Sequence, residues 1–173
     1  WFFVKSSFLK NNKKQLFKNL KSLNFYSFDH EEYFSSDSDN NNEINIPNAI
    51  NLEKIENLYV INGKKINLQQ LTKFPNIQQV FIQNGCLKNK NYRQLPKLPK
   101  LKTLSIQNQY TDDKDTTSDK YSGFNNAPNL ETISLTNLMP TNWDTERWQS
   151  DDINCEEFEN CKNLTGLIFH DFT

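Results

Sequence analysis

The feature that most constrains the fold is an apolar pattern that recurs six times along the chain. Each segment carries four apolar residues, and the gaps between them hold two, two and one other residues. If the nine positions of a segment are numbered in order, the apolar residues stand at positions 1, 4, 7 and 9. The six segments occupy residues 17–25, 52–60, 74–82, 98–106, 127–135 and 161–169. Recurrence of this kind predicts a repeat architecture rather than one irregular core.

The spacing within each segment changes from three to two, and this change predicts a turn followed by a strand. Positions 7 and 9 alternate with other residues at positions 6 and 8, as in a strand with one buried face. Positions 1 and 4 have the spacing of a turn that leads into that strand. Successive segments begin 35, 22, 24, 29 and 34 residues apart. Because each unit can bury its apolar side only against its neighbours, six parallel strands are expected to stack side by side.

The segments resemble leucine-rich repeats, in the LxxLxxLxLxx phase of the internalin-like subclass. The resemblance covers residues 17–173 and implies an α/β solenoid, a right-handed superhelix of about six parallel strands on the concave face with short helices or turns on the convex face. The asparagine position of the family is occupied here by Phe28, Gly63, Gly85, Gln109, Leu138 and Phe172. Asparagine stands one residue earlier in four units, where it would either form a ladder in a shifted register or make turns: Asn62, Asn84, Asn108 and Asn137.

The residues between the segments predict how each unit returns to the next strand. Residues 66–74 and 153–158 have helical spacing, and residues 91–95 are suited to one helical turn before Pro96. Proline follows position 1 in three segments, at Pro75, Pro99 and Pro128. There its fixed φ would restrict the chain that leads into the strand.

Three stretches lie outside the regular units. Residues 1–16 are expected to form an N-terminal cap over the first unit of the repeat domain, which spans residues 17–173. Residues 35–45 and 111–120 are low-complexity and acidic, so both are expected to be surface insertions.

No comparable cap follows the last segment, which predicts an uncovered strand at that edge of the sheet. Three interpretations fit this edge. The molecule continues beyond it, a partner or a second copy pairs with it, or His170 and Asp171 discourage pairing there.

Composition narrows the classes of function. Hydrophobic residues make up 35% of the chain, below the usual share of about 45–50%, which favours one thin apolar layer. The net charge of -1 gives no overall field that would attract nucleic acid or an anionic membrane. No run of about 18 apolar residues is present, so no membrane span is expected.

The compartment is left open by the sequence. Three cysteines cannot all pair within one chain, and this slightly favours a reducing, cytoplasmic setting. The sequence starts at Trp1 without a methionine, so the N-terminus looks trimmed and a secreted or surface location is also possible.

The strand residues that alternate with the buried ones are expected to line the concave face. Tyr59, Ile61 and Phe81 would cluster there on neighbouring strands, and exposed aromatic residues are typical interface anchors. The residues predicted to bind a partner on this face are Tyr26, Tyr59, Ile61, Phe81, Gln83, Ser105, Gln107, Ser134 and Thr136. The alternative is that residues 1–16 or the acidic insertion fold over the cluster.

Several other motifs are interpreted as structural or coincidental. Two basic runs are interpreted as solvated surface rather than as phosphate-binding sites. The first comprises Lys10, Lys13, Lys14, Lys18 and Lys21, and the second comprises Lys88, Lys90, Arg93, Lys97, Lys100 and Lys102. The acidic group Asp112, Asp113, Asp115 and Asp119 lacks the spacing and the glycine of a calcium loop. Asn163 begins a glycosylation sequon, which is interpreted as a chance occurrence. Cys155 and Cys161 could form a redox or metal pair, but Cys161 occupies position 1 and is expected to be a buried apolar residue.

The sequence carries none of the usual signatures of an enzyme. Its only histidines are His30 and His170, and its four glycines are far apart, which argues against a phosphate-binding loop. A pairing of Cys86 with a histidine in the fold stays open. We therefore expect a non-catalytic protein–protein interaction module without cofactor or metal. The alternatives are a recognition fragment of a larger cell-surface or effector protein that binds protein or glycan and, less favoured, nucleic-acid binding through the basic runs.

Overall fold

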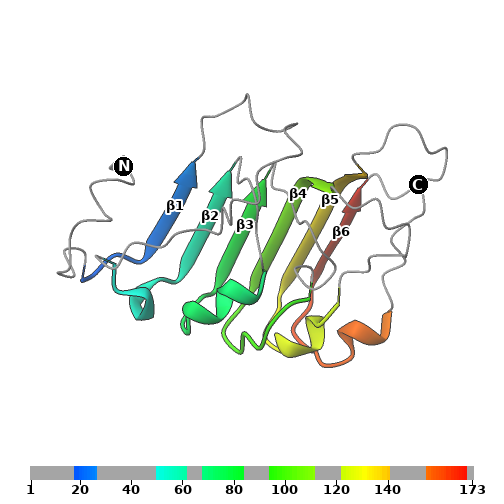
Figure 1. The fold of residues 1–173 in the computed structure, drawn as a ribbon. Coiled ribbons are helices and arrows are strands. Elements are labelled where there is room, and N and C mark those ends of the chain that lie inside the picture. The colour runs from blue at the N-terminus through cyan, green and yellow to red at the C-terminus, as the bar shows by residue number, and fades with distance from the viewer. Residues whose placement is uncertain are drawn as a thin grey trace.

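A computed structural model describes residues 18–26, 50–61, 68–83, 94–111, 122–140 and 155–170 of this 173-residue chain. These residues form one parallel six-stranded sheet, in which the order of the strands is their order in the sequence (Figure 1). The strands are β1 (Ser22–Tyr26), β2 (Asn57–Ile61), β3 (Gln79–Gln83), β4 (Thr103–Thr111), β5 (Thr132–Pro140) and β6 (Gly166–His170). The prediction of six parallel strands that stack in chain order is confirmed.

All helices in the described ranges are short 3₁₀ helices that precede a strand. They are η2 (Leu52–Lys54), η3 (Leu68–Lys73), η5 (Phe124–Asn126) and η6 (Cys155–Phe158). Figure 1 shows them at the end of the sheet where the strands begin. Helical spacing over residues 66–74 and 153–158 thus corresponds to η3 and η6, which are tighter than α-helices.

The helical turn predicted over residues 91–95 is wrong for its described part. Gln94 instead forms a parallel bridge with Ser122, and the Leu95 amide donates to the Ser122 carbonyl at 2.9 Å. The backbone is extended there because the neighbouring unit supplies a hydrogen-bond partner that a local helix would have replaced.

The three-residue spacing of positions 1 and 4 is explained by a closed turn. In five units the amide at position 4 donates to the carbonyl at position 1, over 3.0–3.2 Å; Ile77 to Phe74 and Leu101 to Leu98 are examples. Pro75, Pro99 and Pro128 occupy the second residue of this turn, where a fixed φ is favoured. In these five units the turn therefore places two apolar side chains in the core, or packed against it, immediately before the strand.

The register of the sheet aligns the same position of every segment. Position 7 forms one continuous row across the six strands: Leu23, Leu58, Val80, Leu104, Ile133 and Leu167. The first five members of this row are buried, with exposed fractions between 0% and 8%. Position 9 forms a parallel row in which Val60, Ile82, Ile106 and Leu135 are buried. A single apolar layer along one face of the sheet is therefore the core.

The burial of these rows ends at β6. Leu167 is 49% exposed and Phe169 is 38% exposed, although their neighbours Ile133 and Leu135 are fully buried. Among the described residues β6 pairs only with β5, and the prediction made for its other edge stays a prediction. A position in the repeat is therefore not sufficient for burial, because each unit also needs a neighbour on both sides.

One polar residue is buried in this layer without compensation. Gln70, in η3, is 8% exposed, and neither atom of its side-chain amide has a hydrogen-bond partner among the described residues. We expect Gln70→Leu to raise the free energy of unfolding by about 1–3 kcal/mol, because it removes a desolvated amide and keeps similar volume. Urea unfolding followed by far-UV circular dichroism measures the change.

The adjacent Gln69 offers the matched control. Its side chain is exposed and donates to the Gln94 carbonyl at 2.8 Å, so Gln69→Leu should give no gain in stability. A Gln70→Leu protein less stable than the original would contradict the prediction.

Candidate partner-binding surface

Positions 6, 8 and 10 of each unit alternate with the core positions along the strands, and the described side chains there lie on the face of the sheet opposite the core, which we call the outer face. Each position forms one column across the strands, since the register pairs equal positions. The columns are Ser22, Asn57, Gln79, Thr103, Thr132 and Gly166; Asn24, Tyr59, Phe81, Ser105, Ser134 and Ile168; and Tyr26, Ile61, Gln83, Gln107, Thr136 and His170.

All nine residues predicted to bind a partner fall in the second and third of these columns. Tyr59, Phe81, Ser105 and Ser134 follow one another across β2 to β5. Tyr26, Ile61, Gln83, Gln107 and Thr136 follow one another across β1 to β5. The register therefore brings the predicted set together on one face, over five adjacent strands. For Tyr26 only the backbone position is described.

An aromatic pair forms the apolar centre of this set. Tyr59 and Phe81 are direct cross-strand partners, and their ring centroids lie 6.2 Å apart with the planes tilted by 44°. This is the range in which aromatic pairs attract each other. Ile61 stands two residues after Tyr59 on the same face, and all three side chains are half-buried. They form a small apolar cluster with part of its surface open to solvent, which we call the aromatic cluster (Tyr59, Ile61 and Phe81).

Amides and hydroxyls surround the aromatic cluster. Gln107 donates to the Ser105 hydroxyl at 3.3 Å, and Asn57 donates to the Ser22 hydroxyl at 3.0 Å. None of the outer-face side chains that the structure describes is charged. The face consequently offers apolar contact and neutral hydrogen bonds rather than ionic ones.

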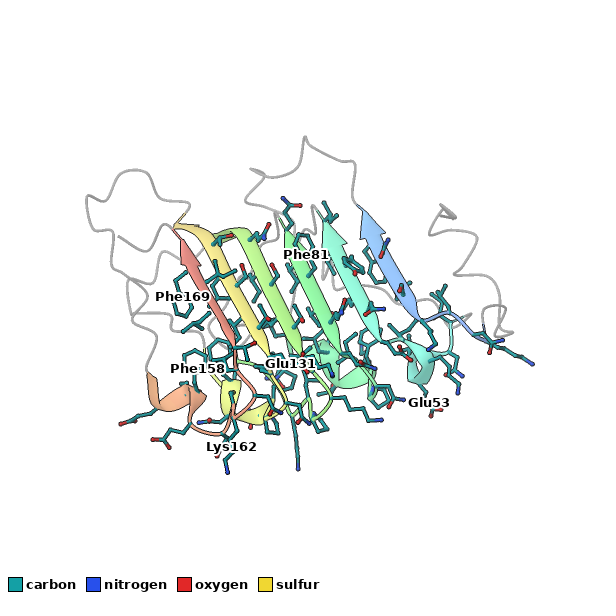
Figure 2. All side chains as sticks on the ribbon, turned by 180° about the vertical axis from the view of Figure 1, so that it is seen from behind. Glu53, Phe81, Glu131, Phe158, Lys162 and Phe169 are labelled. Carbon is teal, nitrogen blue, oxygen red and sulfur yellow. The ribbon has the colours of Figure 1, made fainter. Side chains whose placement is uncertain are left out.

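The charged side chains gather instead at the end of the sheet where the strands begin. Position 5 carries the ion pairs Lys21–Glu56 at 3.0 Å and Lys102–Glu131 at 2.9 Å. Figure 2 shows Glu53 and Lys162 near this end and Phe81 within the sheet. Such exposed pairs contribute little to stability, and they partly neutralise the described lysines of both basic runs.

A ladder of side-chain hydrogen bonds connects the turns of neighbouring units at the same end of the sheet, and it was not predicted from the sequence. Asn76 donates to the Glu53 carbonyl at 2.6 Å and accepts from Lys100 at 2.5 Å. Two units further on, Asn129 donates to the Pro99 carbonyl at 2.6 Å and accepts from Asn163 at 3.3 Å. The side chains in these contacts belong to position 3 (Asn76, Lys100, Asn129 and Asn163), so the recurrence of asparagine at that position was the signal for the ladder. The sequon residue Asn163 has a structural role in this ladder.

Cys161 is a buried apolar residue, as its position in the repeat predicts. It is 5% exposed, and its thiol lies 3.4 Å from the Phe124 carbonyl and 3.8 Å from the Ala127 carbonyl. Desolvation by burial raises the pKa of this thiol, which keeps it in the unreactive protonated form.

The other candidate residues lie outside the described ranges or have undescribed side chains. Among these are His30, Cys86, the N-terminal cap over residues 1–16, the acidic stretches 35–45 and 111–120, and the shifted asparagines of the repeat. The side chains of Cys155 and His170 also belong to this group. The predictions made for these residues stay predictions.

No protein-family model matches the chain, and a search of curated proteins gives no significant match. In the described ranges, no helix has the length and apolar character needed to cross a membrane.

Proposed function

We propose that this chain is a protein-interaction module of the leucine-rich-repeat type, with the outer face as the concave surface of a right-handed solenoid. Three observations support the solenoid. The strands are parallel and follow chain order, equal positions pair across every interface, and in five units a short turn leads into the strand at the same end of the sheet. Connections between neighbouring parallel strands are almost always right-handed.

The aromatic cluster is the observation that carries the proposed function. Tyr59 and Phe81 contact each other and keep part of their surface open, although a buried apolar layer lies on the opposite side of the same strands. Aromatic side chains lose little conformational freedom on binding and often dominate the affinity of an interface. The neutral amides and hydroxyls beside them would supply the polar rim of such an interface.

The proposed partner is a protein segment with apolar side chains and few charges. The described outer face has no cations to meet phosphates, which makes nucleic acid a poor fit. A glycan is the second candidate, favoured by the same combination of aromatic rings, amides and hydroxyls on one uncharged face. Catalysis, a cofactor and a metal form no part of this proposal.

Peptide selection tests the proposed site directly. A phage-displayed library of random peptides is selected on the immobilised protein, and the affinity of the best peptide is measured by biolayer interferometry. We expect Tyr59→Ala combined with Phe81→Ala to weaken binding by about 2–4 kcal/mol, a 30-fold loss or more, because both anchors are removed.

Thr132→Ala provides the control for this experiment. Thr132 lies on the same face on β5, three strands from Tyr59, and its replacement should change the affinity by less than about threefold. Full retention of the peptide by the double variant would refute the site. Binding of a neutral oligosaccharide on a glycan array, lost in the same double variant, would favour the glycan alternative.

A further inference from the structure

The outer face changes its chemistry from β3 to β4. In the second column of this face, Phe81 on β3 is the direct neighbour of Ser105 on β4, and Ser134 on β5 comes next. In the third column, Thr136 stands on β5 two residues after Ser134, on the same side of the strand. The aromatic cluster is therefore followed across the sheet by a group of hydroxyl side chains, which we call the hydroxyl cluster (Ser105, Ser134 and Thr136).

The hydroxyl cluster keeps hydrogen-bonding capacity for a ligand. Its three residues are half-buried, so part of each side chain is open to solvent. Ser105 accepts a hydrogen bond from Gln107 at 3.3 Å, which leaves its own hydroxyl proton available for donation. In the described part of the chain, the hydroxyls of Ser134 and Thr136 have no hydrogen-bond partner. A ligand on this cluster must supply hydrogen bonds, because a polar group that loses water without gaining a partner costs free energy.

Neutral groups that both donate and accept hydrogen bonds are complementary to the hydroxyl cluster. A serine or threonine hydroxyl has one donor and two acceptor positions, so it can pair with an amide or with another hydroxyl. None of the described side chains on the outer face is charged, and the ion pairs Lys21–Glu56 and Lys102–Glu131 belong to position 5, at the start of the strands. A charged ligand group would lose water here without meeting an opposite charge, which costs far more free energy than for a neutral group.

The spacing of the strands sets the length of a ligand that covers both clusters. Tyr59 on β2 and Ser134 on β5 occupy the same column and are separated by three strand spacings. With about 4.8 Å between neighbouring strands, this row spans roughly 14 Å. An extended peptide advances about 3.3 Å per residue, so about five residues cover the row. One short segment can therefore contact the aromatic cluster and the hydroxyl cluster at the same time.

We propose that the ligand of the outer face is a peptide segment of two parts that crosses the strands from β2 to β5. Its apolar part contacts the aromatic cluster, and its uncharged polar part, which carries serine, threonine, asparagine or glutamine, bonds to the hydroxyl cluster. This inference rests on the proposed function, because it starts from a protein partner at the aromatic cluster. It adds the class of segment that is selected and assigns the selection of the polar part to Ser134 and Thr136.

A double-mutant cycle with the phage-selected peptide tests this proposal. Ser134→Ala combined with Thr136→Val removes two hydroxyls with little change in volume, and it should weaken binding of the peptide about tenfold, because two neutral hydrogen bonds are lost. Alanine in place of the polar residues of the peptide should weaken binding to the unmodified protein by a similar factor. That alanine peptide should bind the double variant and the unmodified protein equally. Biolayer interferometry gives the four affinities, and far-UV circular dichroism checks the fold of the variant.

Thr132→Ala again provides the matched control. Thr132 stands on β5 two residues before Ser134 and belongs to the first column, outside the proposed contact, so its replacement should change the affinity by less than about threefold. Full affinity of the Ser134→Ala and Thr136→Val variant, or selected peptides with charged residues in place of the polar part, would overturn the two-part ligand. If binding is lost in Tyr59→Ala with Phe81→Ala but kept in that variant, the proposed function stands and only this inference fails. Peptide retained by the Tyr59→Ala and Phe81→Ala variant would refute both.

Discussion

Leu104→Ala is expected to lower the free energy of unfolding by about 2–5 kcal/mol, which would unfold a large share of a marginally stable domain. Leu104 is 1% exposed on β4 and lies in the middle of the position 7 row, between Val80 and Ile133. Truncation removes apolar contacts and leaves a cavity between two neighbouring strands that are themselves held in register. Urea unfolding followed by far-UV circular dichroism provides the measurement.

Leu167→Ala tests whether burial, rather than position in the repeat, sets this cost. Leu167 occupies the same row on β6 but is 49% exposed, so its truncation should cost less than about 1 kcal/mol. Equal losses for Leu104→Ala and Leu167→Ala would contradict the assigned end of the core.

Gly123→Ala is expected to lower the free energy of unfolding by about 2–4 kcal/mol, although it adds only one methyl group. Gly123 has φ 81° and ψ 15° at the start of η5, a left-handed conformation that L-amino acids disfavour. An added Cβ would lie 2.6 Å from the Leu95 carbonyl oxygen, which belongs to the preceding unit. The Gly123 amide also donates to Glu157 at 2.7 Å, so a shift of the backbone would weaken that contact with the following unit.

Gly166→Ala is the control for this second prediction. Gly166 has no unfavourable φ, and the atoms nearest to an added Cβ belong to the Thr132 side chain, at 3.1 Å and beyond. Relief of that contact requires Thr132 to shift by only a few tenths of an ångström, so the cost should be about 1 kcal/mol, less than at Gly123. If Gly166→Ala were as destabilising as Gly123→Ala, backbone strain at Gly123 would not be the cause.

The candidate site was predictable from the sequence because a strand has a period of two. Once Leu58 and Val80 were assigned to equal positions, Tyr59 and Phe81 had to become neighbours on the opposite face. The 44° tilt of the two rings and their partial burial were not predictable, since both depend on how the neighbouring side chains pack. The uncharged character of the described face could be read directly from the alternating residues.

The ion pairs and the asparagine contacts at the start of the strands follow sequence patterns that apolar periodicity does not reveal. Asparagine recurs at position 3, and position 5 carries Lys21, Glu56, Lys102 and Glu131, yet neither pattern is apolar. Contacts such as Asn76 with the Glu53 carbonyl span more than twenty residues and require that the turns of neighbouring units superimpose. That superposition is a consequence of the sheet register, and a single segment does not display it.

The sequence by itself determined the strands, their parallel order and the face that each side chain occupies. These features depend on local periodicity and on the need of each unit to bury its apolar side against the next. The tertiary structure alone decided which members of a row are buried, that Gln94 pairs with Ser122 instead of turning into a helix, and that Gly123 must adopt a positive φ. Those outcomes depend on distances between units, because the free energy of a buried side chain or a backbone hydrogen bond is set by the neighbour that approaches it. No pattern within one segment specifies that neighbour.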